Sequence, residues 1–169
     1  ECGEFSQLGS WFSIIGEINL HKGDNNKALD NMNRALEKKD GIDINWLALL
    51  YYNLGYYYLR NDENDKAISY LEKSLIIQNK IEEKTNIPET SILLYLSYKQ
   101  IGNEYNEKEI HQLIKEKEAN YEYYITYALY QLLEDTAYLE TAYNQIQELA
   151  NNLEDGAKFL SYPIPKAII

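Results

Sequence analysis

The chain has few of the residues on which metal binding, disulfide formation and catalysis usually depend. Its single cysteine, Cys2, cannot form a disulfide within the chain. The two histidines, His21 and His111, are distant in sequence and neither belongs to an HExxH motif, so a zinc site is not expected. Glycine-rich phosphate-binding motifs are missing as well. The sequence therefore predicts no cofactor, no metal and no enzymatic activity.

Positive charge and long apolar runs are also scarce. The chain has 16 basic and 27 acidic residues, which gives a formal net charge of −11. Such a balance argues against a nucleic-acid partner, which needs a concentrated basic surface, and against anionic membranes. No apolar run approaches the roughly 18–20 residues of a membrane span. We expect a cytoplasmic protein, and because the chain begins at Glu1 rather than methionine, a fragment or processed form.

What the sequence does contain is an internal repeat. Gly16 and Gly55 lie at the same distance before an alanine, Ala28 and Ala67 respectively, and similar residues flank both pairs. Because a unit that recurs must pack against its own copies, the repeat indicates an array of similar helical hairpins. The small residues have a packing reason, since they let the two helices of a unit approach closely.

Helical periodicity runs through the whole chain and predicts an all-α protein. The first helix carries an apolar stripe, formed by Phe5, Leu8, Phe12, Ile15 and Ile18. Gly23 is expected to end this helix in the left-handed conformation, and Asp24 to cap the next one. Asn61 is expected to replace Gly23 in the second unit.

The chain reads as a single domain, 1–169, with units at about 9–42, 48–81, 88–118 and 120–153. In the third unit, Gly102 is predicted to end the first helix. In the fourth, a tyrosine-rich helix leads to a turn around 134–136. A closing segment, 154–169, contains Pro163 and Pro165, which exclude one continuous helix there.

These units resemble the tetratricopeptide repeat (TPR), whose period is about 34 residues. With Gly16 and Gly55 at the family's glycine position, matching residues include Phe12 with Ala28, and Tyr51 with Ala67. The third and fourth units are degenerate, and the spacing between the two glycines is longer than the family period. The resemblance implies a right-handed superhelix (α-solenoid) of about four helix-turn-helix units.

In that family the first helices of successive units line a concave groove. The corresponding positions here include Leu49, Leu59, Glu89, Ile92, Leu96 and Gln100. The residues that we expect to bind a partner are Ser13, Glu17, His21, Tyr52, Tyr56, Arg60 and Lys99. For Tyr52 and Tyr56, packing between neighbouring units is an equally good interpretation. Ser13 and Glu17 stand where chaperone-binding members have Lys and Asn, and Glu17 would repel a peptide carboxylate, so that type of binding is not expected.

The resemblance implies a non-catalytic scaffold that binds a protein or peptide in the groove, with no nucleic-acid or membrane partner. The open ends of such an array could also mediate self-association. The alternative is a sensor or regulatory arm of a larger signalling or transcription-regulating protein, responsive to a peptide or small ligand. Lengthened repeats and the closing segment resemble those of bacterial regulatory proteins of this kind. The sequence of any flanking module would discriminate between the two readings.

Overall fold

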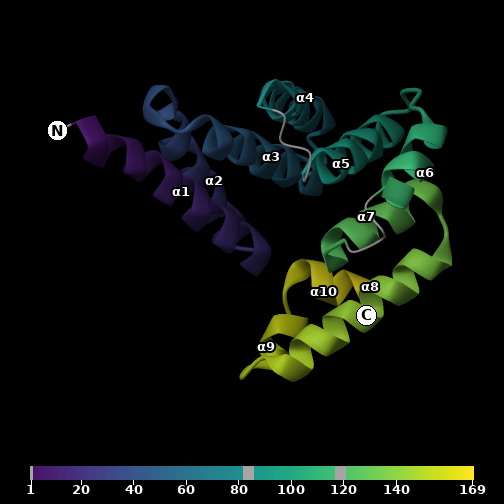
Figure 1. Ribbon diagram of the computed structural model, residues 1–169. Helices are drawn as coiled ribbons and strands as arrows, with labels where there is room; N and C mark the ends of the chain where they lie inside the picture. Colours follow the sequence, from purple (N-terminus) through teal and green to yellow (C-terminus); the bar gives the residue numbers. More distant parts are fainter. Residues whose placement is uncertain (1, 82–85, 117–120) are drawn as a thin grey trace.

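The computed structural model describes residues 2–81, 86–116 and 121–169, and within these residues every regular element is helical. Ten α-helices and one short 3-10 turn follow one another along this described part of the chain (Figure 1). The helices are α1 (Cys2–Lys22), α2 (Asn25–Leu36), α3 (Ile44–Arg60), α4 (Asn64–Lys80), α5 (Ile87–Gln100), α6 (Glu107–Glu116), α7 (Tyr123–Leu133), α8 (Thr136–Asn152), α9 (Gly156–Leu160) and α10 (Pro163–Ile168). The 3-10 turn is Lys39–Gly41.

Close contact within the first two helix pairs depends on the two repeat glycines. A Cβ atom at Gly55 would lie 2.5 Å from Cγ of Leu71, and one at Gly16 would lie 2.8 Å from Cγ of Met32. Ala28 and Ala67, on the facing helices, are fully buried. The predicted close approach is confirmed, and the side chains that fill the space over the glycines are those of Met32 and Leu71.

The helix ends lie where the local sequence predicts them, except that the left-handed residue after α3 was predicted one position too early. Gly23 and Gly102 both have positive φ, at 79° and 75°, and end α1 and α5 as predicted. At the end of α3, however, Asp62 adopts the left-handed conformation, with φ 59°, whereas Asn61 does not. The reason is register: the amides of Asp62 and Glu63 bond back to Leu59 and Tyr58, as those of Gly23 and Asp24 do to Leu20 and Asn19.

The face of α1 that is buried is not the face that carries the apolar stripe expected from the sequence. Small residues and Leu20 form that face, and Ser13 and Leu20 are fully buried. Leu8, Ile15 and Ile18 instead remain between 41% and 47% exposed. Because Gly16 brings α2 so close, the contact between the two helices excludes the large residues beside it. The stripe is therefore divided: Phe12 packs against the main core, Ile18 lines a cavity against α7 and α9, and Leu8 and Ile15 stay exposed.

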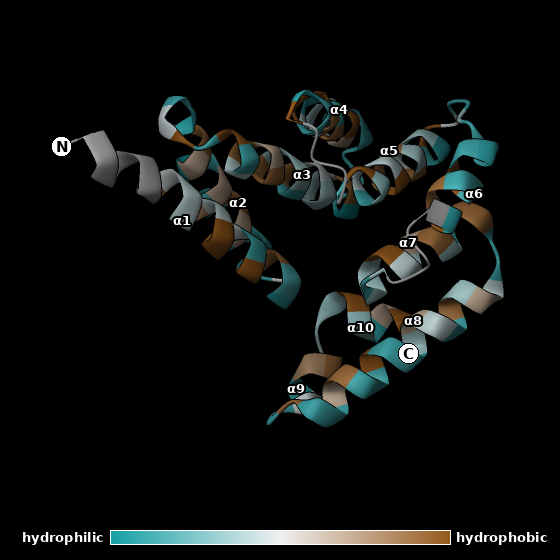
Figure 2. Cartoon of the chain, viewed as in Figure 1, coloured by the Kyte–Doolittle hydropathy of each residue, from teal (hydrophilic) through white to brown (hydrophobic). Residues whose placement is uncertain are grey.

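The first helices of the four pairs form a continuous row, because α1 contacts α3, α3 contacts α5, and α5 contacts α7. Hydrophobic residues recur along α3, α5 and α7 (Figure 2), and most of the main core belongs to this row and to the facing side of α4. Pro163 begins α10 after a break at Ser161 and Tyr162, so the closing segment forms two short helices.

The closing segment returns to the end of α1, far from the N-terminus (Figure 1). Helix α10 contacts both α8 and α1, and the ring of Pro163 lies directly against Gly23. Phe159 of α9 packs edge-on against Tyr123 of α7, with ring centroids 5.9 Å apart. As a result, one end of the helical row is in contact with the other through α9 and α10.

Candidate functional site

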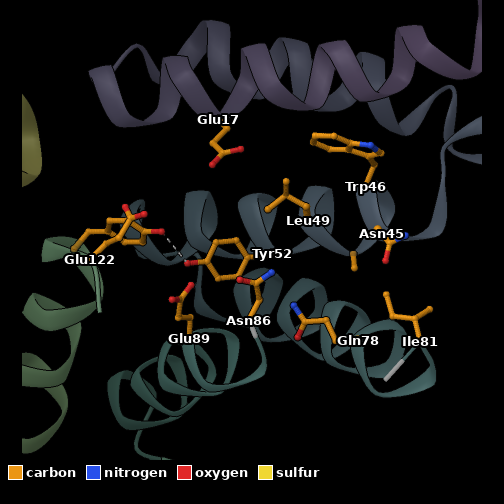
Figure 3. Close-up of a pocket in the computed structure, with 12 residues that line it drawn as sticks. Glu17, Asn45, Trp46, Leu49, Tyr52, Gln78, Ile81, Asn86, Glu89 and Glu122 are labelled. Carbon is orange, nitrogen blue, oxygen red and sulfur yellow. Dashed lines mark hydrogen bonds between the residues drawn. The ribbon is translucent and has the colours of Figure 1, made fainter. Parts of the chain in front are cut away.

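A cavity of about 350 Å³, the four-helix cavity, lies where α1, α3, α5 and the start of α7 meet, and the last turn of α4 also lines it (Figure 3). The residues that line it come from elements far apart in the sequence. They are Glu17, Asn45, Trp46, Ala48, Leu49, Tyr52, Gln78, Ile81, Asn86, Glu89, Glu122 and Tyr124. Its size is at the lower end of the range for ligand pockets, which suits a small group or a single side chain.

Three carboxylates line this cavity from three directions. Glu17 extends from α1, Glu89 from the first turn of α5, and Glu122 stands immediately before α7. Partial burial raises the pKa of Glu17, and the negative charge of Glu122 raises it further, while a hydrogen bond donated by Asn53 at 3.2 Å acts in the opposite sense. These three carboxylates therefore give the part of the cavity that they surround a negative electrostatic potential.

Two buried tyrosines form the floor beside these carboxylates. The hydroxyl of Tyr52 donates to the hydroxyl of Tyr124 at 3.4 Å. Burial raises the pKa of both phenols well above the ordinary range, and the nearby charge of Glu89 raises both further. Figure 3 shows Tyr52 between Glu17 and Glu89. Both phenols are therefore neutral at physiological pH and can present hydroxyl groups and ring faces.

An aromatic cluster continues from Tyr124 toward the end of α1. The rings of Tyr56 and His21 lie 5.2 Å and 5.1 Å from that of Tyr124. Burial lowers the pKa of His21, and the guanidinium of Arg60 lowers it further. His21 is therefore neutral at physiological pH and acts as an aromatic member of this cluster.

The predicted partner-binding residues do not together form one continuous exposed groove. Tyr52 and Tyr56 are only 6% and 4% exposed, so both pack between helices, and Tyr52 also lines the cavity. Ser13 is fully buried and is not accessible to a partner. Glu17 lines the cavity, and His21 lines a neighbouring, more apolar one of about 440 Å³ between α1, α7 and α9.

Arg60 and Lys99 are engaged at helix ends. Arg60 donates from Nη1 to the carbonyl of Leu20, 2.8 Å away, in the last turn of α1. Lys99 donates from Nζ to the carbonyls of Gln131 and Leu132 at the end of α7, each at 3.0 Å. Cations at helix C-termini stabilise the unpaired carbonyls and the helix dipole. The two residues predicted as binding anchors therefore each join two helices of the row.

Several lining residues were not among the predicted binding residues. Glu122 could have been found, because with Ala128 at the glycine position of the fourth unit it shares a register position with Leu49 and Glu89. Trp46 and Gln78 lie outside this register. Trp46 lies in the first turn of α3 and Gln78 in the last turn of α4, and only the packing of α3 against α4 and α5 brings both to the cavity.

Comparison with known proteins gives no functional assignment, so the cavity is the basis for one. No family model matches the chain, and neither a curated protein nor a solved structure matches it. Within the described ranges no helix is both long and apolar enough to cross a membrane. The same residues contain no group of three histidine, cysteine or acidic side chains placed to hold a metal ion.

Proposed function

We propose that this chain is a non-catalytic, TPR-like helical repeat that binds a peptide or protein segment across the row formed by α1, α3, α5 and α7. The observation that carries the proposal is the cavity itself, to which all four helices contribute lining residues. The repeat glycines and the shared register of Leu49, Glu89 and Glu122 support a repeat array of this kind.

The mixture of groups around the cavity suits recognition of a chain segment. Trp46 is 36% exposed; it lines this cavity and also a second one, of about 610 Å³, beside α1. A tryptophan in such a position offers a large contact area at a small cost in conformational entropy. Leu49 adds apolar surface, and the acidic groups supply directional polar contacts. A segment lying on Trp46 would reach both cavities.

The sensor or regulatory arm remains the second candidate, and one observation favours it. Helix α10 lies against α1 at Gly23, and Pro163 and Ile164 line a cavity of about 280 Å³ together with Tyr56 and Arg60. A ligand bound in this cavity, which α3, α5 and α7 also line, would therefore contact the closing segment directly. Hydrogen exchange of the α9–α10 amides that changes when a peptide binds would support this candidate.

The proposal is tested by selecting a displayed library of random peptides against the full chain. Selected peptides are then titrated against the parent, against Trp46→Ala, and against Tyr143→Ala as a control. Tyr143 is 42% exposed on α8 and lines neither of the two cavities that Trp46 lines. We expect Trp46→Ala to weaken binding by about tenfold or more, as loss of an aromatic anchor does, and Tyr143→Ala to leave it nearly unchanged.

Two results would overturn the proposal. One is the failure of repeated selections to recover any peptide that binds the folded chain. The other is recovery of peptides whose affinity is the same for Trp46→Ala and Tyr143→Ala, because such peptides would bind on another face. Circular dichroism of each variant establishes that a loss of binding is not a loss of folding.

A further inference from the structure

The four-helix cavity presents negative charge and hydrogen-bond acceptors to whatever enters it. Glu17, Glu89 and Glu122 line it, and none of its described lining residues is basic. The charge of Glu122 reaches Glu17, and the charges of Glu89 and Glu122 both reach the phenol of Tyr124. The three carboxylates therefore act on the same small volume, where an anionic ligand would be repelled and a cation attracted.

A buried amide gives an independent indication of the ligand. Gln78 is only 2% exposed and lines the cavity, and its Oε1 finds no hydrogen-bond donor among the described residues. The orientation of the amide is fixed by its neighbour. The hydroxyl of Thr90 donates to the carbonyl of Asn86 at 2.9 Å, so it must accept from Nε2 of Gln78, 3.1 Å away. The remaining acceptor, Oε1, has no donor among the described residues, and an unsatisfied buried acceptor is costly, so a ligand whose donor reaches Oε1 would gain a hydrogen bond that these residues do not supply.

The aromatic side chains complete a site for a positive charge. Trp46, Tyr52 and Tyr124 line the same cavity as the carboxylates. Ring faces attract cations through their quadrupole, most strongly at tryptophan. Acceptors and rings come from different helices and approach from different directions. This arrangement suits a compact ammonium with three rotatable donors better than a planar guanidinium, which favours paired acceptors in one plane.

We propose that the four-helix cavity receives the protonated side-chain amine of a lysine in the bound peptide. This inference rests on the proposed function and names the chemistry of its ligand. The alkyl stem of the lysine would lie along Trp46 and Leu49, and the ammonium would face the carboxylates and Oε1 of Gln78. The requirement for donors and positive charge separates this site from one that recognises a terminal carboxylate.

The test uses the fluorescence of Trp46 in a Trp11→Phe background, because the chain has only two tryptophans. The probes are blocked peptides of sequence Gly-Ala-Lys-Ala-Gly, the same peptide with Nε-acetyl-lysine, the same peptide with glutamate, and n-butylammonium. We expect the lysine peptide to bind at least tenfold more tightly than the acetylated one. The glutamate peptide should not bind, and n-butylammonium should bind more weakly than the lysine peptide.

Matched variants separate the cavity from the general acidity of the chain. Glu17→Gln should weaken binding of the lysine peptide by about fivefold to tenfold, as loss of a partly buried charge does. Glu122 lines the cavity from an exposed position, and Glu122→Gln should weaken binding by about threefold. Glu104→Gln and Glu140→Gln remove the same charge from exposed positions that do not line the cavity. These two controls should change the affinity less than twofold.

The outcomes distinguish the two proposals. Equal binding of the lysine and acetyl-lysine peptides overturns the lysine site, as does an equal loss with the control variants. Peptide binding itself is judged by the library selection and would stand in either case. Binding of n-butylammonium as tight as that of the lysine peptide would support the cation site but overturn its assignment to a peptide. Absence of any Trp46 response to the lysine peptide overturns the site.

Discussion

The hydroxyl of Tyr52 on α3 donates to the hydroxyl of Tyr124 on α7 at 3.4 Å, in the buried floor of the cavity. The contact joins two helices that are far apart in the sequence. Its neighbour Tyr56 is equally buried, but its hydroxyl has no hydrogen-bond partner among the described residues. The two tyrosines therefore form a natural pair for measuring what this hydrogen bond contributes.

Removing the Tyr52 hydroxyl should destabilise the fold, whereas removing that of Tyr56 should not. We expect Tyr52→Phe to lower the free energy of unfolding by about 0.5–1.5 kcal/mol, the usual net contribution of one hydrogen bond. Tyr56→Phe should be neutral or slightly stabilising, because it removes an unsatisfied buried group. Urea unfolding of both variants measures the difference. An equal loss in the two would contradict the hydrogen bond.

The two repeat glycines should differ in their tolerance of alanine. At Gly55 the new Cβ would meet the fully buried, branched Leu71, so we expect Gly55→Ala to cost about 1–3 kcal/mol through overpacking. At Gly16 it would lie 2.8 Å from Cγ of Met32, which is also fully buried but is unbranched, so we expect a smaller loss of about 1 kcal/mol. Thermal unfolding of both variants provides the comparison. Equal stability of Gly55→Ala and the parent would show that Leu71 can move aside.

Lys99 should stabilise the end of α7. Lys99→Met removes the bonds to the carbonyls of Gln131 and Leu132 and the ion pair with Glu134, whose atoms lie 2.7 Å apart. We expect a loss of about 1 kcal/mol in the free energy of unfolding. The exposed Lys108 of α6 provides the control, as Lys108→Met.

A local measurement shows whether that loss arises at α7. Lys99 lowers the pKa of Glu134, so in Lys99→Met the pKa of this carboxyl should return toward its ordinary value of 4.5. NMR titration of Glu134 measures it directly. An unchanged pKa of Glu134 would mean that the ion pair does not persist in solution.

Glu17 should make the fold less stable at neutral pH than an uncharged residue would. Its pKa is raised above 4.5, chiefly by burial, so the folded state holds the proton more tightly than the unfolded state. The contribution of Glu17 to stability is complete below 4.5 and is lost as pH rises through the raised pKa. Glu17→Gln should therefore be more stable than the parent at neutral pH, and the difference should vanish in acid.

The pH dependence of unfolding in parent and variant measures this difference. His21, whose lowered pKa removes stability as pH falls below 6.5, is present in both chains and cancels in the comparison. Glu89 and Glu122 line the same cavity and remain in both. Glu104→Gln removes the same charge at an exposed site outside the cavity and is the control. A parent that is more stable than Glu17→Gln at neutral pH would contradict the raised pKa.

Much of the fold was accessible from the sequence because its determinants are local. Amphipathic periodicity predicted the helices, and Gly23, Asp24 and Gly102 marked ends that the structure confirms. Gly16 and Gly55 predicted close approach within each pair. Asn61 was assigned the left-handed position that belongs to Asp62, an error of one residue in register. The apolar stripe of α1 also misled, because periodicity shows that a face is apolar and not which face its neighbour covers.

The cavity was decided by tertiary packing. Tyr52 and Arg60 were identified in the sequence as groove residues. In the structure the buried hydroxyl of Tyr52 donates a hydrogen bond to that of Tyr124, and the guanidinium of Arg60 donates one to the carbonyl of Leu20 at the end of α1. Short-range patterns cannot specify such contacts, because partners from α1, α3 and α7 meet only once the helices have packed. The sequence by itself determined that the chain is helical, where its hairpins turn and how closely each pair can pack. Only the tertiary structure brought Glu17, Glu89 and Gln78 to one cavity, since their convergence depends on crossing angles between helices.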